Sequence, residues 1–151
     1  MLHEITFGNY KGKPLVWIPI YKNNNLEYIL REPICRMCFD SGISMYSDSD
    51  ARKYIVEEFI PSAFSQEELD MLAPNERCLG DVAYLLQHYD IKKQKYSVNR
   101  KIFKEKHAWW VRDHIEDNNE ALWGAIWRFG LAADINKKMK CGIRPCITFK
   151  N

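Results

Sequence analysis

The chain has 151 residues, the length of one domain, and 46% of them are hydrophobic and 13% aromatic. This composition excludes a chain that is disordered throughout. The formal net charge of +2 is too small to indicate a nucleic-acid partner by itself, and no apolar run approaches the ~20 residues that a membrane-spanning helix needs. We therefore expect a single domain over residues 1–151 with no membrane partner.

The cellular compartment is predicted from the N-terminus and from the cysteines. The start of the chain, residues 1–4, lacks the basic and apolar regions of a signal peptide. The chain has five cysteines, an odd number, and reduced thiols are the simplest interpretation of it. We therefore expect a cytoplasmic protein.

Two β-rich runs near the N-terminus predict a hairpin. The first run covers residues 15–21, and the second covers residues 26–31, where every other residue is apolar. The polar tract between them contains three asparagines, which tolerate the left-handed conformations of turns. Pro19 lies inside the first run and has no amide hydrogen to donate, which favours an edge position or a bulge there.

Helical spacing of apolar residues begins after residue 50. The polar residues 47–50 can accept hydrogen bonds from the free amides of a helix start. They precede four residues at helical spacing: Ala51, Tyr54, Ile55 and Phe59. We expect a helix near residues 49–60 that ends at Pro61.

A second helix is predicted from a capping box. Ser65 is placed to cap the helix, and Glu68 stands at the third helical position. We expect this helix near residues 66–73, with Pro74 ending it. Residues 81–88 fit either a helix or a strand, and we favour the helix.

Residues 91–107 concentrate the positive charge of the chain. They hold seven basic residues and one acid, a charge of +6, which leaves −4 for the rest of a chain with a net charge of +2. Such a segment can contact an acidic protein or nucleic-acid phosphates, or it can be a solvated loop. The predicted binding residues are Lys92, Lys93, Lys95, Tyr96, Arg100, Lys101, Phe103 and Lys104, together with Asp113 and His114 beyond the segment.

Two tryptophans and two arginines organise the C-terminal third. Trp109 and Trp110 can together bury roughly 400 Å². Arg112 follows them, and Arg144 lies in a Gly-Ile-Arg-Pro turn. These four residues could form a ligand site, but we expect a structural role: the indoles fill the core and the arginines bind loop carbonyls.

Several motifs resemble a bacterial and phage-borne domain family of unknown function. Members carry Phe-Gly-x-Tyr, Ala-Phe-Ser-x-x-Glu, Trp-Trp-Leu-Arg-Ser-Pro and Gly-Val-Arg-Pro-Ala-Leu segments. The matching segments here are residues 7–10, 63–68, 109–112 and 142–147, with a further match at 48–54. The chain departs from the family at Asp113 and His114, where Ser-Pro is usual, and over residues 77–89.

The terminal Gly-x-Arg motif at residues 142–144 is also similar to that of C-type-lectin-like domains, which include the formylglycine-generating enzymes. This resemblance implies a compact α+β fold. Two helices are then expected against a small twisted antiparallel sheet, with the N- and C-terminal strands paired. The last strand is expected over residues 143–149.

The cysteines offer a metal or redox alternative. Cys35 and Cys38 have the spacing of half a zinc site, and Cys141 and Cys146 are candidates for the other half. If Cys141 and Cys146 lay on one regular strand, their separation of five residues would place them on opposite faces. Formylglycine-generating enzymes hold copper with a cysteine pair that precedes the Gly-x-Arg motif, whereas here the cysteines flank it. We therefore assign no metal and no cofactor.

Catalysis through His107, Asp113 or His114 is the remaining enzymatic alternative, because a histidine beside a carboxylate can transfer protons. No nucleophile or oxyanion donor stands at a recognisable spacing from them. We do not expect an enzyme.

The expected function is protein–protein recognition by a non-enzymatic binding protein. The phage-borne members of the resembled family imply a small inhibitor of a host defence protein, with a nucleic-acid-processing complex among the possible targets. Direct nucleic-acid binding through residues 92–106 is the first alternative, and a zinc- or thiol-dependent enzyme is the second. The oligomeric state is left open.

Overall fold

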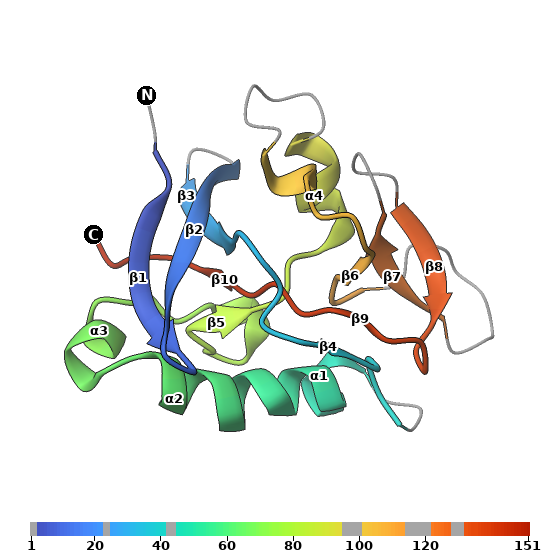
Figure 1. The fold of residues 1–151 in the computed structure, drawn as a ribbon, viewed down its shortest axis with the longest axis horizontal. Helices are drawn as coiled ribbons and strands as arrows, with labels where there is room; N and C mark the ends of the chain where they lie inside the picture. The colour runs from blue at the N-terminus through green and yellow to red at the C-terminus, as the bar shows by residue number, and fades with distance from the viewer. Residues whose placement is uncertain (1–2, 23–24, 42–44, 95–100, 114–121, 128–131) are drawn as a thin grey trace.

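The computed structural model describes residues 3–22, 25–41, 45–94, 101–113, 122–127 and 132–151. It shows an α+β fold in which two five-stranded sheets lie side by side above one long helical segment (Figure 1). The C-terminal segment crosses the molecule and contributes one strand to each sheet. The predicted α+β class is therefore confirmed, although the strands form two sheets rather than one.

The first sheet has the strand order β1-β2-β3-β10-β5. Its strands are β1 (Ile5–Tyr10), β2 (Lys13–Lys22), β3 (Asn25–Leu30), β5 (Ala83–Tyr84) and β10 (Cys146–Ile147). The predicted hairpin is β2–β3, in register from Trp17–Leu30 to Lys22–Asn25. Pro19 pairs with Tyr28 of β3, and it lies two residues beyond Trp17, which pairs with Ile5 at the start of β1.

The predicted pairing of the N- and C-terminal strands is wrong. Strands β2 and β3 stand between β1 and β10. Strand β10 pairs with β3 and β5 instead. The predicted last strand over residues 143–149 is also shorter than expected, since β10 covers two residues. Residues 143–145 instead connect the sheets, and their backbone accepts hydrogen bonds from Ile34 and Leu30.

The second sheet has the order β4-β9-β6-β7-β8. Its strands are β4 (Arg36–Met37), β6 (Trp109–Trp110), β7 (Leu122–Ile126), β8 (Ala132–Asn136) and β9 (Cys141–Gly142). Three of these have two residues each, and the β6–β9 pair is parallel. The short central strands need further contacts to hold them in place, and buried side chains provide these.

The long helix runs over residues 50–63 in three parts: α1 (Asp50–Lys53), a π-helical stretch η2 (Tyr54–Phe59) and α2 (Ile60–Ala63). Ser49 caps it, because its side chain accepts a hydrogen bond from the amide of Arg52. The predicted end at Pro61 is wrong. The amide of Ile60 bonds to the carbonyl of Ile55, five residues back, and this wider turn makes room for a proline without an amide hydrogen.

The capping box at Ser65 and Glu68 is confirmed, and it begins α3 (Gln66–Asp70). This helix is shorter than predicted because Leu72 leaves it to form a β-bridge with Phe149. The remaining helical turns are η1 (Tyr46–Asp48), η3 (Glu76–Cys78), α4 (His88–Gln94) and η4 (Lys101–Phe103).

The favoured helix over residues 81–88 is wrong, because β5 lies there and α4 begins only at His88. Residues 83–86 are all buried, and they alternate between two core clusters. Ala83 and Leu85 pack in the first cluster, while Tyr84 and Leu86 pack in the second. A run buried on both faces shows no alternation of polar and apolar residues, which is the signal that distinguishes a strand.

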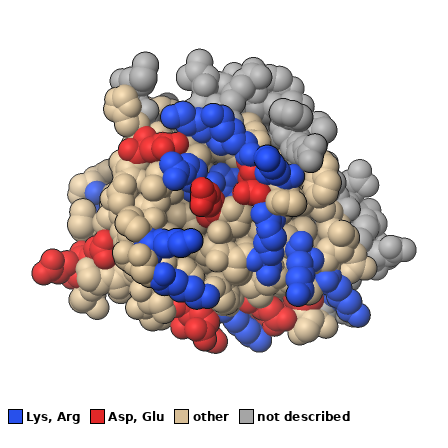
Figure 2. Space-filling view, viewed as in Figure 1, with Lys and Arg blue, Asp and Glu red and all other residues tan. Residues whose placement is uncertain are grey.

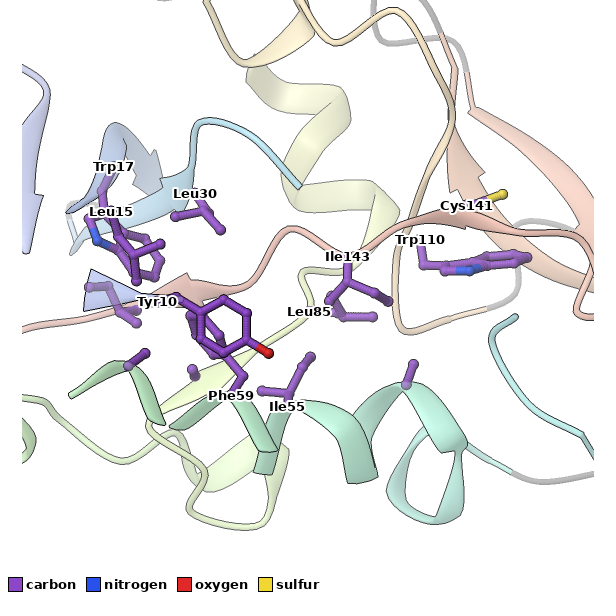
Figure 3. Packing of buried hydrophobic residues seen from close by; sticks show 14 of the residues in the cluster. Tyr10, Leu15, Trp17, Leu30, Ile55, Phe59, Leu85, Trp110, Cys141 and Ile143 are labelled. Carbon is purple, nitrogen blue, oxygen red and sulfur yellow. The ribbon is translucent and has the colours of Figure 1, made fainter. Parts of the chain in front are cut away.

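The first core cluster lies between the long helix and both sheets. Figure 3 shows Ile55 and Phe59 rising from the helix toward Tyr10 and Leu85, with Trp17 and Trp110 at opposite ends. Both indoles are fully buried. This continuous layer joins the two sheets to one helix and fixes the position of the segments that form the surface described next.

Candidate binding face

Lysine and arginine side chains gather on the face turned toward the viewer in Figure 2, with carboxylates among them. Two adjoining hollows lie among charged residues. The hairpin hollow, of about 260 Å³, lies between the β1–β2 turn and residues 30–34. The charged hollow, of about 430 Å³, is lined by Glu4, Arg31, Glu32, Lys101, Lys104 and Glu105. Arg31 and Glu32 line both, so the two hollows form one surface, which we call the basic face.

The basic face has a surplus of positive charge. Its linings contain five cations, Lys11, Lys13, Arg31, Lys101 and Lys104, and three carboxylates, Glu4, Glu32 and Glu105. Glu4 lies 3.5 Å from Arg31 and 3.8 Å from Lys101. Over the described part of the chain, no carboxylate lies within ion-pair distance of Lys13 or Lys104, so these exposed ammonium groups are available to an acidic ligand.

Glu105 is held at the edge of the charged hollow. Its Oε1 accepts hydrogen bonds from Arg36 Nη2 at 2.7 Å and from the amide of His107 at 3.2 Å. Burial raises the pKa of Glu105, but the bonds from Arg36 and His107 and the charges of Arg36 and Arg144 outweigh it, so the pKa is lowered overall. Glu105 therefore stays a carboxylate in neutral solution.

Arg144 lies beneath the basic face and is 1% exposed. Its Nε donates to the carbonyl of Leu30 at 2.9 Å, and its Nη1 donates to that of Ile102 at 2.6 Å. Its guanidinium also lies 4.5 Å from the centre of the Trp109 ring, a cation–π contact. Burial lowers the pKa of Arg144 to about 10, against the opposing charge of Glu105, and the side chain remains a cation at neutral pH.

Arg112 and the two tryptophans also hold segments together. Arg112 Nη1 donates to the carbonyl of Leu85 at 2.7 Å, and the Trp110 indole donates to that of Met37 at 2.9 Å. Trp109 packs in the second core cluster and Trp110 in the first. These contacts are packing and loop-tying contacts, the arrangement expected of a structural role.

The predicted binding residues are divided by the structure. Lys101 and Lys104 are exposed on the basic face. Phe103 is half-buried and packs against the second core cluster, so its ring is not a fully exposed anchor for a partner. Lys92 and Lys93 belong to α4, but their side chains lie outside the description. Lys95, Tyr96, Arg100 and His114 also lie outside the described residues.

Of the residues considered as an enzymatic alternative, the structure describes His107 and Asp113 and does not pair them with each other. Asp113 binds His88 instead, through its Oδ2 at 3.0 Å from the ring Nδ1 and its Oδ1 at 3.0 Å from the backbone amide. His107 lies apart and is exposed, and its amide binds Glu105. The Asp113–His88 pair connects the start of α4 to the end of the β6 segment, which is a structural task.

The four cysteines considered as a zinc alternative, to which we assign no metal, do not all lie together. Cys141 pairs with Met37 next to Cys38, but Cys146 lies in the other sheet, where its thiol donates to Glu27 at 3.3 Å. Within the described segments, no cluster of three or more His, Cys, Asp or Glu residues could hold a metal ion. Burial raises the pKa of Cys35, and that of Cys141 to about 11, so both stay protonated near pH 7 and are weak nucleophiles.

Sequence reasoning missed the contribution of the hairpin to the basic face. Lys11 lies in the β1–β2 turn, Lys13 begins β2, and Arg31 follows β3. They lie 70 or more positions before Lys101 and Lys104 in the sequence. A count of charge along the chain cannot find such a patch, because tertiary contacts such as the Glu4–Lys101 ion pair bring its parts together.

The sequence and structure were compared with protein-family models, curated proteins and solved structures, and nothing matches the chain. The resemblance to the phage-borne domain family therefore stays a prediction from the motifs. Among the helices that the structure describes, none has both the length and the apolar character needed to cross a bilayer.

Proposed function

We propose that this chain is a binding protein that recognises an acidic protein through the basic face. The observation that carries this proposal is the surplus of cations over carboxylates around two adjoining hollows. Exposed lysines of this kind steer an oppositely charged partner and raise its association rate. The more specific prediction, inhibition of a host defence protein, rests on the resemblance alone, as does a C-type-lectin-like origin of the fold.

An acidic protein fits this face better than a nucleic acid does. Three carboxylates are interspersed among the cations, and each would repel a phosphate backbone, whereas a protein partner can present cations to them. Base stacking needs exposed aromatic rings. Tyr10 is the single aromatic residue in the described linings of the two hollows, and it is buried.

The test is a capture experiment with two matched charge-reversed variants. The first variant changes Lys11, Lys13 and Lys104 to glutamate, and the control changes three exposed basic residues outside the hollows, Lys53, Arg77 and Lys150. We expect wild type and control to retain the same acidic protein from nuclease-treated host lysate, and the first variant to lose it.

Two results would contradict the proposal. Equal capture by both variants would mean that the basic face is only solvated surface. Loss of capture after nuclease treatment, with a steep linear fall of log affinity against log salt for purified DNA or RNA, would instead indicate a nucleic-acid ligand.

A further inference from the structure

The guanidinium of Arg144 has one donor group that the fold leaves unused. Nε and Nη1 bind the carbonyls of Leu30 and Ile102, but Nη2 is buried and has no hydrogen-bond partner among the described residues. A buried charge with an unpaired donor destabilises the folded protein. Packing of the turn alone does not explain why an arginine stands at position 144, because an apolar side chain of similar volume would fill the same space without an unpaired donor.

Arg144 lies close to the residues that line the charged hollow. Leu30 and Ile102, whose carbonyls bind Arg144, directly adjoin Arg31 and Lys101, which line that hollow from opposite sides. Nε and Nη1 of the planar guanidinium bind one carbonyl from each of these two segments, and Nη2 is its remaining nitrogen. Glu105, on the same hollow, is close enough for its charge and that of Arg144 to affect each other. Its Oε1 is already bound to Arg36 and to the amide of His107.

We infer that the charged hollow is a carboxylate-binding site, in which Arg144 Nη2 and the ammonium groups of Lys101 and Lys104 receive an aspartate or glutamate side chain of the partner. This inference rests on the proposed function and names the anchor point of the interface. The partner's carboxylate would supply the acceptor that Nη2 lacks, and an arginine–carboxylate hydrogen bond is among the stronger kinds in proteins.

The charge of the site favours a carboxylate over a phosphate. The lining of the charged hollow contains three cations and three carboxylates, so Arg144 below it brings the site to +1. A carboxylate carries one negative charge and matches this value. A phosphate monoester carries about −1.5 to −2 and would lie against three glutamates.

Access to Nη2 requires a rearrangement of side chains, since water does not reach this atom in the free protein. The rim contains the exposed residues Arg31, Glu32, Lys101 and Lys104. Exposed side chains of this kind change rotamer within picoseconds to nanoseconds.

The experiment measures binding of a fluorescent tetraglutamate peptide, with inorganic phosphate and a twelve-residue oligothymidylate as the other probes. Fluorescence anisotropy gives the affinities, and NMR of the arginine side-chain N–H groups reports on Arg144. We expect the peptide to shift the Arg144 resonances. We expect Lys104→Gln to weaken the peptide about threefold, and Arg144→Lys, which keeps the charge but removes the fork, to weaken it tenfold or more. Lys53→Gln, on the exposed side of α1, is the control and should have no effect.

A second variant protects the test against misfolding. If Arg144→Lys does not fold, the double change Lys101→Gln and Lys104→Gln, at two exposed positions, should weaken the peptide about tenfold. The inference is overturned if neither this variant nor Arg144→Lys affects the peptide, or if phosphate or oligothymidylate shifts the Arg144 resonances more strongly than the peptide does.

The two proposals fail separately. Capture of an acidic protein that depends on Lys11 and Lys13 but not on Lys101, Lys104 or Arg144 would support the proposed function and overturn the carboxylate site. Specific peptide binding at Arg144 supports the site, and it does so even when no acidic protein is captured, a result that would count against the proposed function alone.

Discussion

Each sheet buries one tryptophan in the shared core, but the two sheets hold their strands in different ways. Trp17 in the first sheet donates to the carbonyl of Phe7 at 2.8 Å, and Trp110 in the second donates to that of Met37 at 2.9 Å. In the first sheet, long strands β1, β2 and β3 pair over many residues. In the second, β4, β6 and β9 have two residues each.

The difference shows what replaces a hydrogen-bonded ladder when strands are short. The edge strand β4 is held by two register pairs with β9, by the Trp110 indole and by the Arg36–Glu105 ion pair. Contacts made by side chains therefore contribute more to holding the strands of the second sheet in place than they do in the first sheet. This contrast makes predictions about which substitutions each sheet tolerates.

The largest expected effect follows removal of the Trp110 ring. Trp110 is fully buried between Phe39 and the rest of the first core cluster. Trp110→Ala leaves a large cavity, and we expect it to lower the free energy of unfolding by about 3–5 kcal/mol. Urea denaturation followed by circular dichroism measures this loss. An unchanged midpoint would mean that the second sheet does not depend on the core we describe.

The contrast between the sheets also explains which parts of the fold were predictable. The β2–β3 hairpin and the two helix starts depend on local signals, namely alternation, an asparagine-rich turn and the caps at Ser49 and Ser65. The strand β5 and the pairing of β10 depend on residues far away in the chain, and both faces of these strands are buried. Their sequences contain no alternation from which a strand or its partner could be inferred.

The candidate site was predictable in part for the same reason. The cluster of lysines at Lys101 and Lys104 is visible as a charged run, but its neighbours Lys11, Lys13 and Arg31 are not. The burial of Arg144 was expected from its turn motif, whereas its unpaired Nη2 depends on how the carbonyls of Leu30 and Ile102 are placed. Phe103 was misjudged because an aromatic residue among lysines fits a core position as well as a surface position.

The next effect in size concerns the contact of the first sheet with the long helix. Gly8 has a φ of +77°, and a Cβ there would lie 2.9 Å from the carbonyl oxygen of Ala63 and 2.8 Å from the Phe64 ring. We expect Gly8→Ala to cost about 2–4 kcal/mol, from the left-handed backbone and the clash together. Gly12 in the β1–β2 turn has a φ of +79° and open space around it.

Gly12→Ala is therefore the matched control for Gly8→Ala, and we expect it to cost only about 1–2 kcal/mol because it has the backbone strain without the clash. Thermal unfolding of the two variants in parallel measures the difference. Equal losses of stability in Gly8→Ala and Gly12→Ala would show that the first sheet can move away from the helix at little cost in free energy.

A smaller effect separates the two indole hydrogen bonds from the packing of the rings. Trp17→Phe and Trp110→Phe each keep an aromatic ring but leave a partly buried carbonyl without its donor, a loss of roughly 1–3 kcal/mol. We expect the amides of β4 to exchange with solvent faster in Trp110→Phe. In Trp17→Phe the amides of β1 should stay protected, because the pairing with β2 still holds that strand. Hydrogen exchange measured by NMR distinguishes the two variants. Equal protection of the β4 amides in Trp110→Phe and the β1 amides in Trp17→Phe would contradict the proposed difference between the sheets.

The smallest effect concerns pH and the ion pair that joins the basic face to the second sheet. The pKa of Glu105 is lower in the folded protein than the ordinary glutamate value of about 4.3. A carboxyl group with a lowered pKa stabilises the fold fully above the unfolded value, and this contribution is lost as the pH falls through the folded value. We therefore expect the Arg36–Glu105 pair to contribute roughly 0.5–1 kcal/mol at pH 7 and less and less below about pH 4.3.

Arg36→Gln should raise the pKa of Glu105 toward its ordinary value, and NMR titration of the Glu105 side chain measures this shift. It should also reduce the loss of stability in acid, which urea denaturation from pH 7 to pH 3 measures. Arg31→Gln is the control, because Arg31 pairs at 3.5 Å with Glu4 and leaves Glu105 untouched. If the two variants show the same Glu105 titration as wild type, the lowered pKa does not come from Arg36. The hydrogen bond from the amide of His107, followed by the charge of Arg144, would then account for the lowered pKa of Glu105.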